Sequence, residues 1–225
     1  MKIIKFVDID IAKVDVDRVE RKGFPEVIYG KGKNSKQIIE IMQVLLDKDE
    51  PVLVTQISQE KADIVLNKFP ESNYHDDSEI LTAGTTNPKL NKGNLYVVCG
   101  GTSDLKIARE TIDVAEWMGM NVHHIFDVGV AGLDRLLSYK DELQTADVII
   151  AIAGMEGSLP TVLSGLVKSP VIAVPTSIGY GANLNGITTM LSMLTSCSSG
   201  VTVTNIDNGF GAAYQAGLII KLLNK

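Results

Sequence analysis

The sequence predicts an α/β protein in which helices cover both faces of a parallel sheet in a three-layer domain, preceded by a small N-terminal α/β domain. From Gly93 onward, short continuous runs rich in Val and Ile alternate with helical segments, as in strands that are buried on both faces. Residues 1 to about 88 are more charged and less apolar, and segment 83–92 has the Gly, Asn and Pro content of a linker. We therefore expect domains at 1–90 and 91–225.

The apolar runs define the elements in order. In the larger domain we expect strands at 95–99, 122–126, 148–153, 171–174 and 201–203, and helices at 104–118, 133–143, 161–167, 187–194 and 211–223. In the smaller domain we expect strands at 26–29, 52–56 and 79–82, a helix capped by Ser35 that includes Leu46, and a helix at 60–68. Strands that alternate with helices predict a doubly wound sheet in the larger domain.

Composition excludes several classes of partner. The 225 residues (24.3 kDa) are 45% hydrophobic and 21% charged, as in an ordinary globular chain with a sizeable core. A net charge of −6 and a pI near 5.1 provide no basic surface for nucleic acid or an anionic membrane. The N-terminus lacks a signal-peptide pattern, and no apolar run approaches the ~18 residues that cross a bilayer. We expect a soluble protein.

Cysteine and histidine content indicates neither a zinc site nor a redox dithiol. Cys99 and Cys197 are far apart and form no C-x-x-C pair, which fits a reducing cytoplasm. His123 and His124 are neighbours on one expected strand and point to opposite faces, and His75 belongs to the other domain. No metal site is therefore expected.

A ligand site is expected where the strands of the larger domain end, because doubly wound sheets bind ligands there. The segments that follow these strands are small and polar: 99–104, 127–132, 154–160, 175–183 and 205–211. Together they should line one rim with glycines, hydroxyls and amides.

The first of these loops is a candidate phosphate site. Gly100 and Gly101 let the backbone approach a ligand closely, while Thr102 and Ser103 offer hydroxyls and N–H groups at a helix N-terminus. Asp104 would bind ribose hydroxyls or cap the helix. The alternative is that Ser103 and Asp104 are simply caps, since the loop matches neither a P-loop nor G-x-G-x-x-G.

Glu156 and Cys197 are the candidate reactive residues. Glu156 follows an apolar strand in G-M-E-G-S-L-P, where a carboxylate flanked by glycines and close to buried surface would suit proton transfer; the alternative is a plain loop carboxylate. Cys197 lies in the turn T-S-C-S-S-G between a helix and a strand, whereas a packing cysteine would more naturally lie inside an apolar element. Activation of the thiol needs a base, and we nominate Glu156. Cys99, at a strand end, is expected to be structural.

Several segments of the larger domain resemble a known family. G-G-T-S-D (100–104), L-P (159–160) and P-V-I-A-V-P (170–175) through A-G (216–217) are similar to the G-S-x-S-D loop, the A-H-L-P-G loop and the final segment of PurE-fold aminoimidazole ribonucleotide carboxylases and mutases. The S-A-H-R loop of those enzymes corresponds to G-V-A-G-L-D-R (129–135), and Ser158 replaces the histidine of A-H-L-P-G. Loss of both histidines leaves no proton shuttle for an imidazole substrate.

Longer motifs extend over nearly the whole chain. They are R-x-G-x-P-E-V-I (21–28), G-T-S-D (101–104), D-V-G-V-A-G (127–132), G-M-E-G (154–157) and S-C-x-S-G-V-T-V-x-N-I-D-N-G-F-G (196–211). By these motifs the chain resembles the LarB family, which is PurE-like. Asp134 is a departure, because such sequences commonly have histidine before Arg135.

The LarB resemblance implies an enzyme of flavodoxin-like, PurE-like fold that makes pyridinium-3,5-biscarboxylic acid mononucleotide and AMP from nicotinic acid adenine dinucleotide and CO2, as the first step toward the nickel-pincer cofactor. Cys197 would be the covalent catalyst and Glu156 its base. The expected substrate-binding residues are Gly100, Gly101, Thr102, Ser103, Asp104, Asp127, Gly129, Gly157 and Ser158, with Asn205, Asp207 and Asn208 around the ring. No tightly bound cofactor is implied; CO2 is a co-substrate, Mg²⁺ is a candidate aid to hydrolysis, and a homo-octamer is expected.

Two alternatives remain at this point. The first is an aminoimidazole ribonucleotide carboxylase or mutase, which the same fold and phosphate loop permit. The second is a nucleotide sensor without catalytic activity, for which ligand binding would survive the loss of Cys197.

Overall fold

The computed structural model describes residues 6–224. The chain divides into two compact units, Met1–Pro88 and Lys89–Lys225. Each unit has its own sheet and its own buried core, and each is described here by itself.

The second unit is built on a five-stranded sheet in which every pairing is parallel. Its strands lie in the order β11-β10-β9-β7-β8, which is the flavodoxin-like order. They are β7 (Asn94–Cys99), β8 (Asn121–Ile125), β9 (Val148–Ala153), β10 (Val171–Pro175) and β11 (Val201–Val203). The fold class predicted from the sequence is confirmed, and the strand bounds differ from the expected ones by one residue at most.

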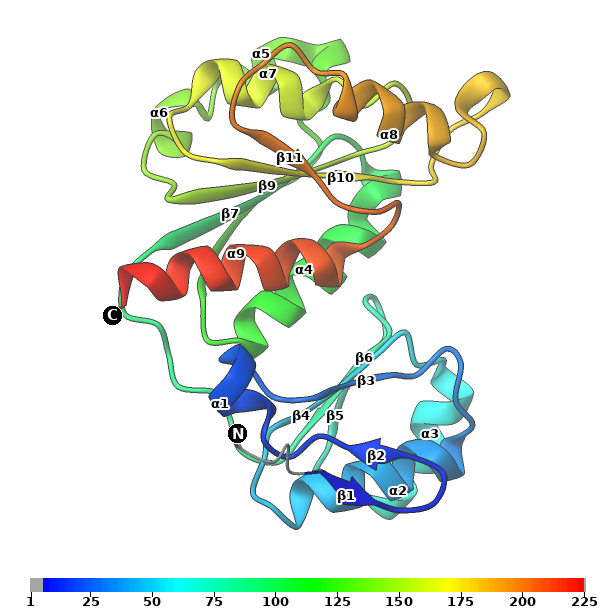
Figure 1. Ribbon diagram of the computed structural model, residues 1–225. Helices are drawn as coiled ribbons and strands as arrows, with labels where there is room; N and C mark the ends of the chain where they lie inside the picture. Colours follow the sequence, from blue (N-terminus) through cyan, green and yellow to red (C-terminus); the bar gives the residue numbers. More distant parts are fainter. Residues whose placement is uncertain (1–5, 225) are drawn as a thin grey trace. The chain divides into compact units, whose positions relative to one another are not determined.

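Helices cover both faces of this sheet (Figure 1). On one face, α4 (Leu105–Trp117) packs against α9 (Gly209–Leu223). The other face carries α5 (Leu133–Leu137), α6 (Lys140–Leu143), α7 (Leu159–Leu166) and α8 (Ile187–Leu194). Short 3-10 turns precede some of these helices: η1 (Thr102–Asp104), η2 (Val130–Gly132) and η3 (Gly181–Asn183).

Three helix predictions in this unit need correction, one of them the start of α9, which is Gly209 rather than Gly211. The single helix expected at 133–143 is broken into α5 and α6, and at the break the Ser138 hydroxyl donates a hydrogen bond back to the carbonyl of Arg135 (2.7 Å), a local contact that competes with the helical backbone. Helix α7 begins at Leu159, two residues earlier than the expected start at Thr161. Its first turn accommodates Pro160 because the N–H that proline lacks has no helical partner there.

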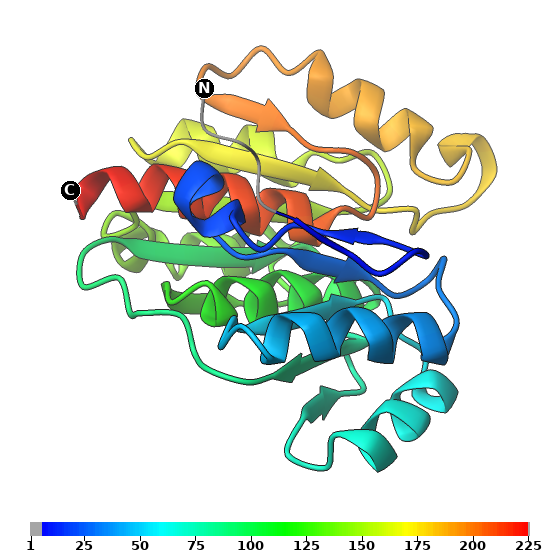
Figure 2. The same cartoon turned by 60° about the horizontal axis from the view of Figure 1, so that its bottom comes forward.

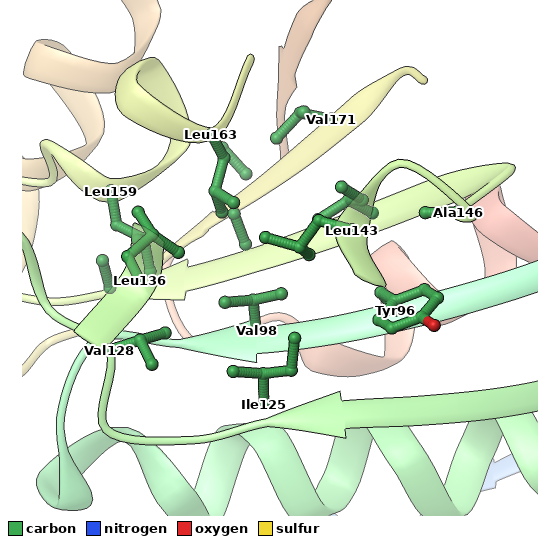
Figure 3. Close-up of a cluster of buried hydrophobic side chains, with 14 of the residues drawn as sticks. Tyr96, Val98, Ile125, Val128, Leu136, Leu143, Ala146, Leu159, Leu163 and Val171 are labelled. Atoms are coloured by element: carbon green, nitrogen blue, oxygen red, sulfur yellow. The ribbon is translucent and has the colours of Figure 1, made fainter. Parts of the chain in front are cut away.

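The core beneath α5–α8 is formed by apolar side chains from β7, β8, β9 and β10 and from the helices (Figure 3). Two partly buried valines of β11, Val201 and Val203, pack against it. Every residue of β9 and β10 is buried. This explains why these strands are continuous apolar runs rather than alternating ones. Leu159 of α7 belongs to the same core, so packing of this side chain holds the first turn of α7 against the sheet.

The first unit contains a four-stranded mixed sheet in the order β3-β4-β6-β5, with β3 parallel to β4 and the other pairs antiparallel. Its strands are β3 (Val27–Tyr29), β4 (Val52–Thr55), β5 (Asn73–His75) and β6 (Ile80–Ala83), with helices α1 (Arg18–Lys22), α2 (Ser35–Leu46) and α3 (Gln59–Lys68). A hairpin of β1 (Val7–Asp8) and β2 (Lys13–Val14) lies beside α2 (Figure 2).

Helix α2 is capped by Asn34, so the prediction of Ser35 as the cap is wrong by one residue. The Asn34 side chain accepts a hydrogen bond from the Gln37 amide (2.9 Å), and the Gln37 side chain accepts one from the Asn34 amide (3.0 Å). This reciprocal capping box satisfies two N–H groups that the helix leaves open.

Across residues 6–224, none of the helices combines the length and apolar character needed to span a membrane.

Candidate active site

A pocket of about 220 Å³ opens at the carboxyl end of the parallel sheet. Strand β7 lies between β8 and β9 in the sheet. The chain passes from β7 to β8 on one side of β7 and then to β9 on its other side, so the loops after β7 and β9 run in opposite directions and leave a crevice for a ligand. The lining residues come from the four loops that follow β7, β8, β9 and β10. They are Gly100, Gly101, Ser103, Asp104, Gly129, Val130, Ala131, Ala153, Gly154, Met155, Glu156, Ser158, Leu159 and Ile178.

The glycine loop after β7 lines the pocket through Gly100, Gly101 and Ser103. A Cβ atom on Gly129 would lie 2.7 Å from the carbonyl oxygen of Gly100, so the loops after β7 and β8 touch through their backbones. Within the described part of the chain, no hydrogen bond is formed by the backbone amides of Thr102 and Ser103. Free amides at the start of a helical segment suit an anion, although the Thr102 side chain itself does not line the pocket.

Asp104 is 5% exposed and holds this loop in place. One carboxylate oxygen accepts a hydrogen bond from the Gly101 amide (3.1 Å) and the other accepts one from the Thr176 hydroxyl (2.7 Å). Burial raises the pKa of Asp104, against these two hydrogen bonds, which lower it. Asp104 thus joins the loop after β7 to the segment that follows β10, and its expected role toward ribose hydroxyls stays a prediction.

The turn that carries Glu156 is clamped by buried polar side chains. Met155 has a left-handed backbone (φ 52°), and its amide donates to the carbonyl of Ile178 (2.8 Å). Its carbonyl accepts hydrogen bonds from the Asn183 amide group (3.0 Å) and from the Thr189 hydroxyl, both of which are buried. The position of the turn is therefore fixed by α8 and the loop after β10.

Glu156 itself is exposed at the mouth of the pocket. The carboxylate is thus open to solvent while its neighbours Gly157 and Leu159 are buried, and its expected role in proton transfer stays a prediction. The Ser158 hydroxyl donates to the Glu156 carboxylate (2.9 Å), so two of the expected site residues contact each other. Gly157, between them, is buried beneath the turn with φ 69°.

Cys197 lies in the turn that precedes β11, and its side chain is exposed rather than packed in hydrocarbon. It does not line the pocket. Val201, the first residue of β11, is level with Val171, the first residue of β10. The turn therefore precedes the amino end of its strand, whereas Glu156 follows the carboxyl end of β9.

The remaining expected residues lie on the rim but outside the pocket lining. The Asp127 carboxylate accepts a hydrogen bond from Arg135 (2.6 Å), and that of Asp207 accepts one from the Ser177 amide (2.8 Å). The Asn208 side chain caps α9 through the Gly211 amide (2.8 Å), and the Asn205 side chain accepts from the amide of Ile206 (2.9 Å). These side chains order the rim around the pocket.

Sequence reasoning missed two groups of residues. The apolar lining includes Met155 and Ile178, which are 44% and 37% exposed, an exposure that the sequence does not reveal. Among the buried polar residues, Thr189 was missed, and Thr176 and Asn183 lie in the expected rim segment 175–183 but were not singled out. Hydroxyl and amide side chains beside glycine-rich loops were the only available signal for them.

Cys99 has a structural environment. It is buried at the end of β7, with its sulfur 3.7 Å from the carbonyl oxygen of Gly101. Burial raises the pKa of the Cys99 thiol to about 11, so this thiol stays protonated near neutral pH.

A flavodoxin-like sheet with a glycine-lined pocket at its switch point is an architecture of nucleotide-binding α/β proteins. Two family models match this chain: a LarB/PurE-like N-terminal domain over residues 6–85 and AIR carboxylase over residues 94–225. The chain belongs to the AIR carboxylase family, which is a family of enzymes, and it carries a LarB/PurE-like N-terminal domain. The resemblance to the LarB family is thereby confirmed.

Relatives share either the whole chain or its second unit. An uncharacterized protein of Methanocaldococcus jannaschii is 42% identical over 95% of this chain and 85% of its own length. N5-carboxyaminoimidazole ribonucleotide mutases of M. jannaschii and Pyrococcus horikoshii are 36% and 31% identical over 57% of this chain, covering 79% and 72% of their own lengths. The crystal structure of a single-residue variant of Treponema denticola PurE2 superposes with a TM-score of 0.48 at 22% identity, over 57% of this chain and 80% of that one.

Proposed function

We propose that this protein carboxylates C5 of the pyridinium ring of nicotinic acid adenine dinucleotide with CO2 and hydrolyses its phosphoanhydride. The products are pyridinium-3,5-biscarboxylic acid mononucleotide and AMP, as in nickel-pincer cofactor biosynthesis. One observation carries the proposal: the ionisable side chains that line the pocket are two carboxylates, Asp104 and Glu156, and the described lining contains no imidazole.

The histidines of this chain lie elsewhere. His123 and His124 are on β8, stacked against Tyr96 and Phe126 respectively, and His75 is on β5 of the first unit. Chemistry that depends on a histidine proton shuttle at the pocket therefore lacks its residue. The match of residues 6–85 to a LarB/PurE-like N-terminal domain supports the same choice of substrate.

A nucleophile is required because C5 of a pyridinium ring is too electron-poor to attack CO2. Addition of the Cys197 thiolate to C6 forms a C–S bond and moves an electron pair into the ring, which gives a neutral enamine. C5 then attacks CO2, forming the new C–C bond. Loss of the C5 proton to a base and departure of the thiolate restore the aromatic ring.

The proposed roles combine the pocket with the separate turn that carries Cys197, and bringing the two together is part of the proposal. Cys197 is exposed and so is accessible to a ring, and Glu156, at the mouth of the pocket, serves as the base that takes the thiol proton and later the C5 proton. The free amides of Thr102 and Ser103 suit a phosphate. Hydrolysis adds one water across the anhydride, and Mg²⁺ would arrive with the diphosphate of the substrate.

The direct test is to identify products by mass spectrometry after the full-length protein is mixed with nicotinic acid adenine dinucleotide and ¹³C-bicarbonate. The expected result is AMP together with a mononucleotide that carries one labelled carboxylate. Glu156→Gln should bind the dinucleotide but carboxylate it about 10²–10⁴-fold more slowly. Full activity of Glu156→Gln would contradict the role of this carboxylate, and an absence of labelled product from the wild type would contradict the function.

A second candidate function is that of an N5-carboxyaminoimidazole ribonucleotide mutase. It is favoured by the 36% identity of the second unit to the M. jannaschii protein of that name. Incubation with N5-carboxyaminoimidazole ribonucleotide separates the two functions. Turnover of this substrate, with none of the pyridine dinucleotide, would establish the alternative.

We also propose that copies of the chain assemble, as an octamer by resemblance. Helix α8 and the loop before it expose an apolar stripe of Tyr180, Leu184, Ile187, Leu191 and Leu194, which are 45–81% exposed. A second copy of the chain is the occupant that we expect to cover this stripe. Light scattering should give an oligomeric mass that Leu191→Lys lowers; a monomeric wild type would contradict the proposal.

The two free thiols support a reducing cytoplasmic location.

A further inference from the structure

The turn around Cys197 is fixed by its neighbours rather than by a regular element. Residues 195–200 lie between α8 and β11 and belong to neither a helix nor a strand. The Ser196 hydroxyl accepts a hydrogen bond from the Ser198 amide (3.3 Å), which closes a small turn with Cys197 at its centre. The thiol is exposed, while both flanking serines are partly buried.

Both flanking serines contact α7. The Ser196 hydroxyl is hydrogen bonded to the hydroxyl of Thr161 (2.8 Å), and the Ser198 hydroxyl accepts a hydrogen bond from the hydroxyl of Ser164. Thr161 and Ser164 are three residues apart, so they lie on one side of the helix. Two hydroxyl pairs therefore hold the cysteine turn against one face of α7.

Helix α7 also contributes to the pocket. Its first residue, Leu159, lines the pocket and is anchored in the core. Glu156 and Ser158 immediately precede it. The hydroxyls of Thr161 and Ser164 thus connect the turn that carries the thiol to the helix whose start forms the pocket wall.

We propose that Thr161 and Ser164 are positioning residues that hold the Cys197 thiol at the place required for attack on the pyridinium ring. This inference rests on the proposed function. Neither residue touches the reacting atoms. Their contribution is to keep the turn in one geometry, since displacement of a reacting group by about 1 Å costs up to about 10²-fold in rate.

The test compares variants that remove the hydroxyls but keep the side-chain shape. The double variant Thr161→Val/Ser164→Ala should lower kcat about tenfold or more, with the KM for nicotinic acid adenine dinucleotide unchanged, because the pocket lining is untouched. Alkylation of Cys197 by iodoacetamide should not slow, because the thiol is already exposed. Thr161→Ser, which keeps a hydroxyl at this position, should have the kcat of the wild type.

Thr195→Val is the matched control. Thr195 lies in the same segment, but its hydroxyl donates to the carbonyls of Leu191 and Ser192 in the preceding helix α8 (2.8 and 3.1 Å) and not to α7, so kcat should change little. An equal loss of kcat in Thr195→Val, or full activity of the double variant, would overturn the positioning role while leaving the function in place. A wild type that makes no carboxylated product would instead overturn the proposed function.

Discussion

The two turns that carry the proposed reactive groups are held in different ways. The Glu156 turn is clamped from beneath by buried side chains, with Asn183 and Thr189 both bonded to the Met155 carbonyl. The Cys197 turn is held at the surface by pairs of hydroxyls on partly buried residues. A buried hydrogen bond costs more to lose than an exposed one. We therefore expect the Glu156 turn to cost more free energy to release than the Cys197 turn.

The largest expected effect tests this difference directly. Asn183→Ala removes the side chain that bonds Met155, Thr189 and the Gly186 amide and leaves buried polar groups without partners. The free energy of unfolding in urea should fall by about 2–3 kcal/mol. Ser196→Ala, the corresponding change in the Cys197 turn, should cost about 1 kcal/mol or less. Equal losses in the two variants would remove the distinction between the turns.

A somewhat smaller loss is expected from a second matched pair around the Glu156 turn. A Cβ on Gly154 would lie 2.4 Å from the carbonyl oxygen of Ile178, whereas a Cβ on Gly165 in α7 would meet no atom within 4 Å. Gly154→Ala should destabilise by about 1–3 kcal/mol and lower carboxylation. Gly165→Ala should stabilise by about 0.5–1 kcal/mol, because alanine favours a helix. Thermal unfolding measures both, and a stable, active Gly154→Ala would show that the turn is not clamped.

The buried carboxyl of Asp104 should make the free energy of unfolding depend on pH. Burial raises the pKa of Asp104 above its ordinary value of 3.8, so the unfolded chain ionises this carboxyl first as the pH rises. The contribution of protonated Asp104 to the free energy of unfolding is therefore fully present below pH 3.8 and is lost as the pH rises through the raised pKa. The difference in free energy of unfolding between wild type and Asp104→Asn should therefore decrease with rising pH, by less than about 1.4 kcal/mol per pH unit. A difference that is flat or increasing would contradict the shift.

The smallest effect is on reactivity alone. Iodoacetamide at neutral pH should modify the exposed Cys197 in the folded protein and Cys99 only after unfolding, because burial raises the pKa of Cys99 to about 11. Counting modified thiols by mass spectrometry with and without urea measures this. Fast modification of Cys99 in the folded protein would show that the end of β7 is accessible to solvent.

The sequence predicted the second unit closely, because strands buried on both faces leave continuous apolar runs such as 148–153. It did not predict β5, since Asn73–His75 has neither an apolar run nor alternation. In the site, the rule that ligands bind at strand ends located the loops. The hydrogen bonds of Asn183 and Thr189 to the Met155 carbonyl could not be predicted, because only the folded chain brings these residues together.

The position of the cysteine turn relative to β11 could have been predicted from the sequence. A turn that immediately precedes a parallel strand lies at the amino end of that strand, while the segment after a strand lies at the carboxyl end. Cys197 precedes β11 and Glu156 follows β9. Their pairing as nucleophile and base remains a prediction, and the connection through α7 is the structural link between them.

The most direct measurement is tandem mass spectrometry of the protein quenched during turnover of nicotinic acid adenine dinucleotide. We expect the pyridine nucleotide to be attached to the peptide containing Cys197, and both this adduct and carboxylation to be lost in Cys197→Ser. Carboxylation by Cys197→Ser at the rate of the wild type, or an adduct on Cys99 instead, would contradict the covalent role of Cys197.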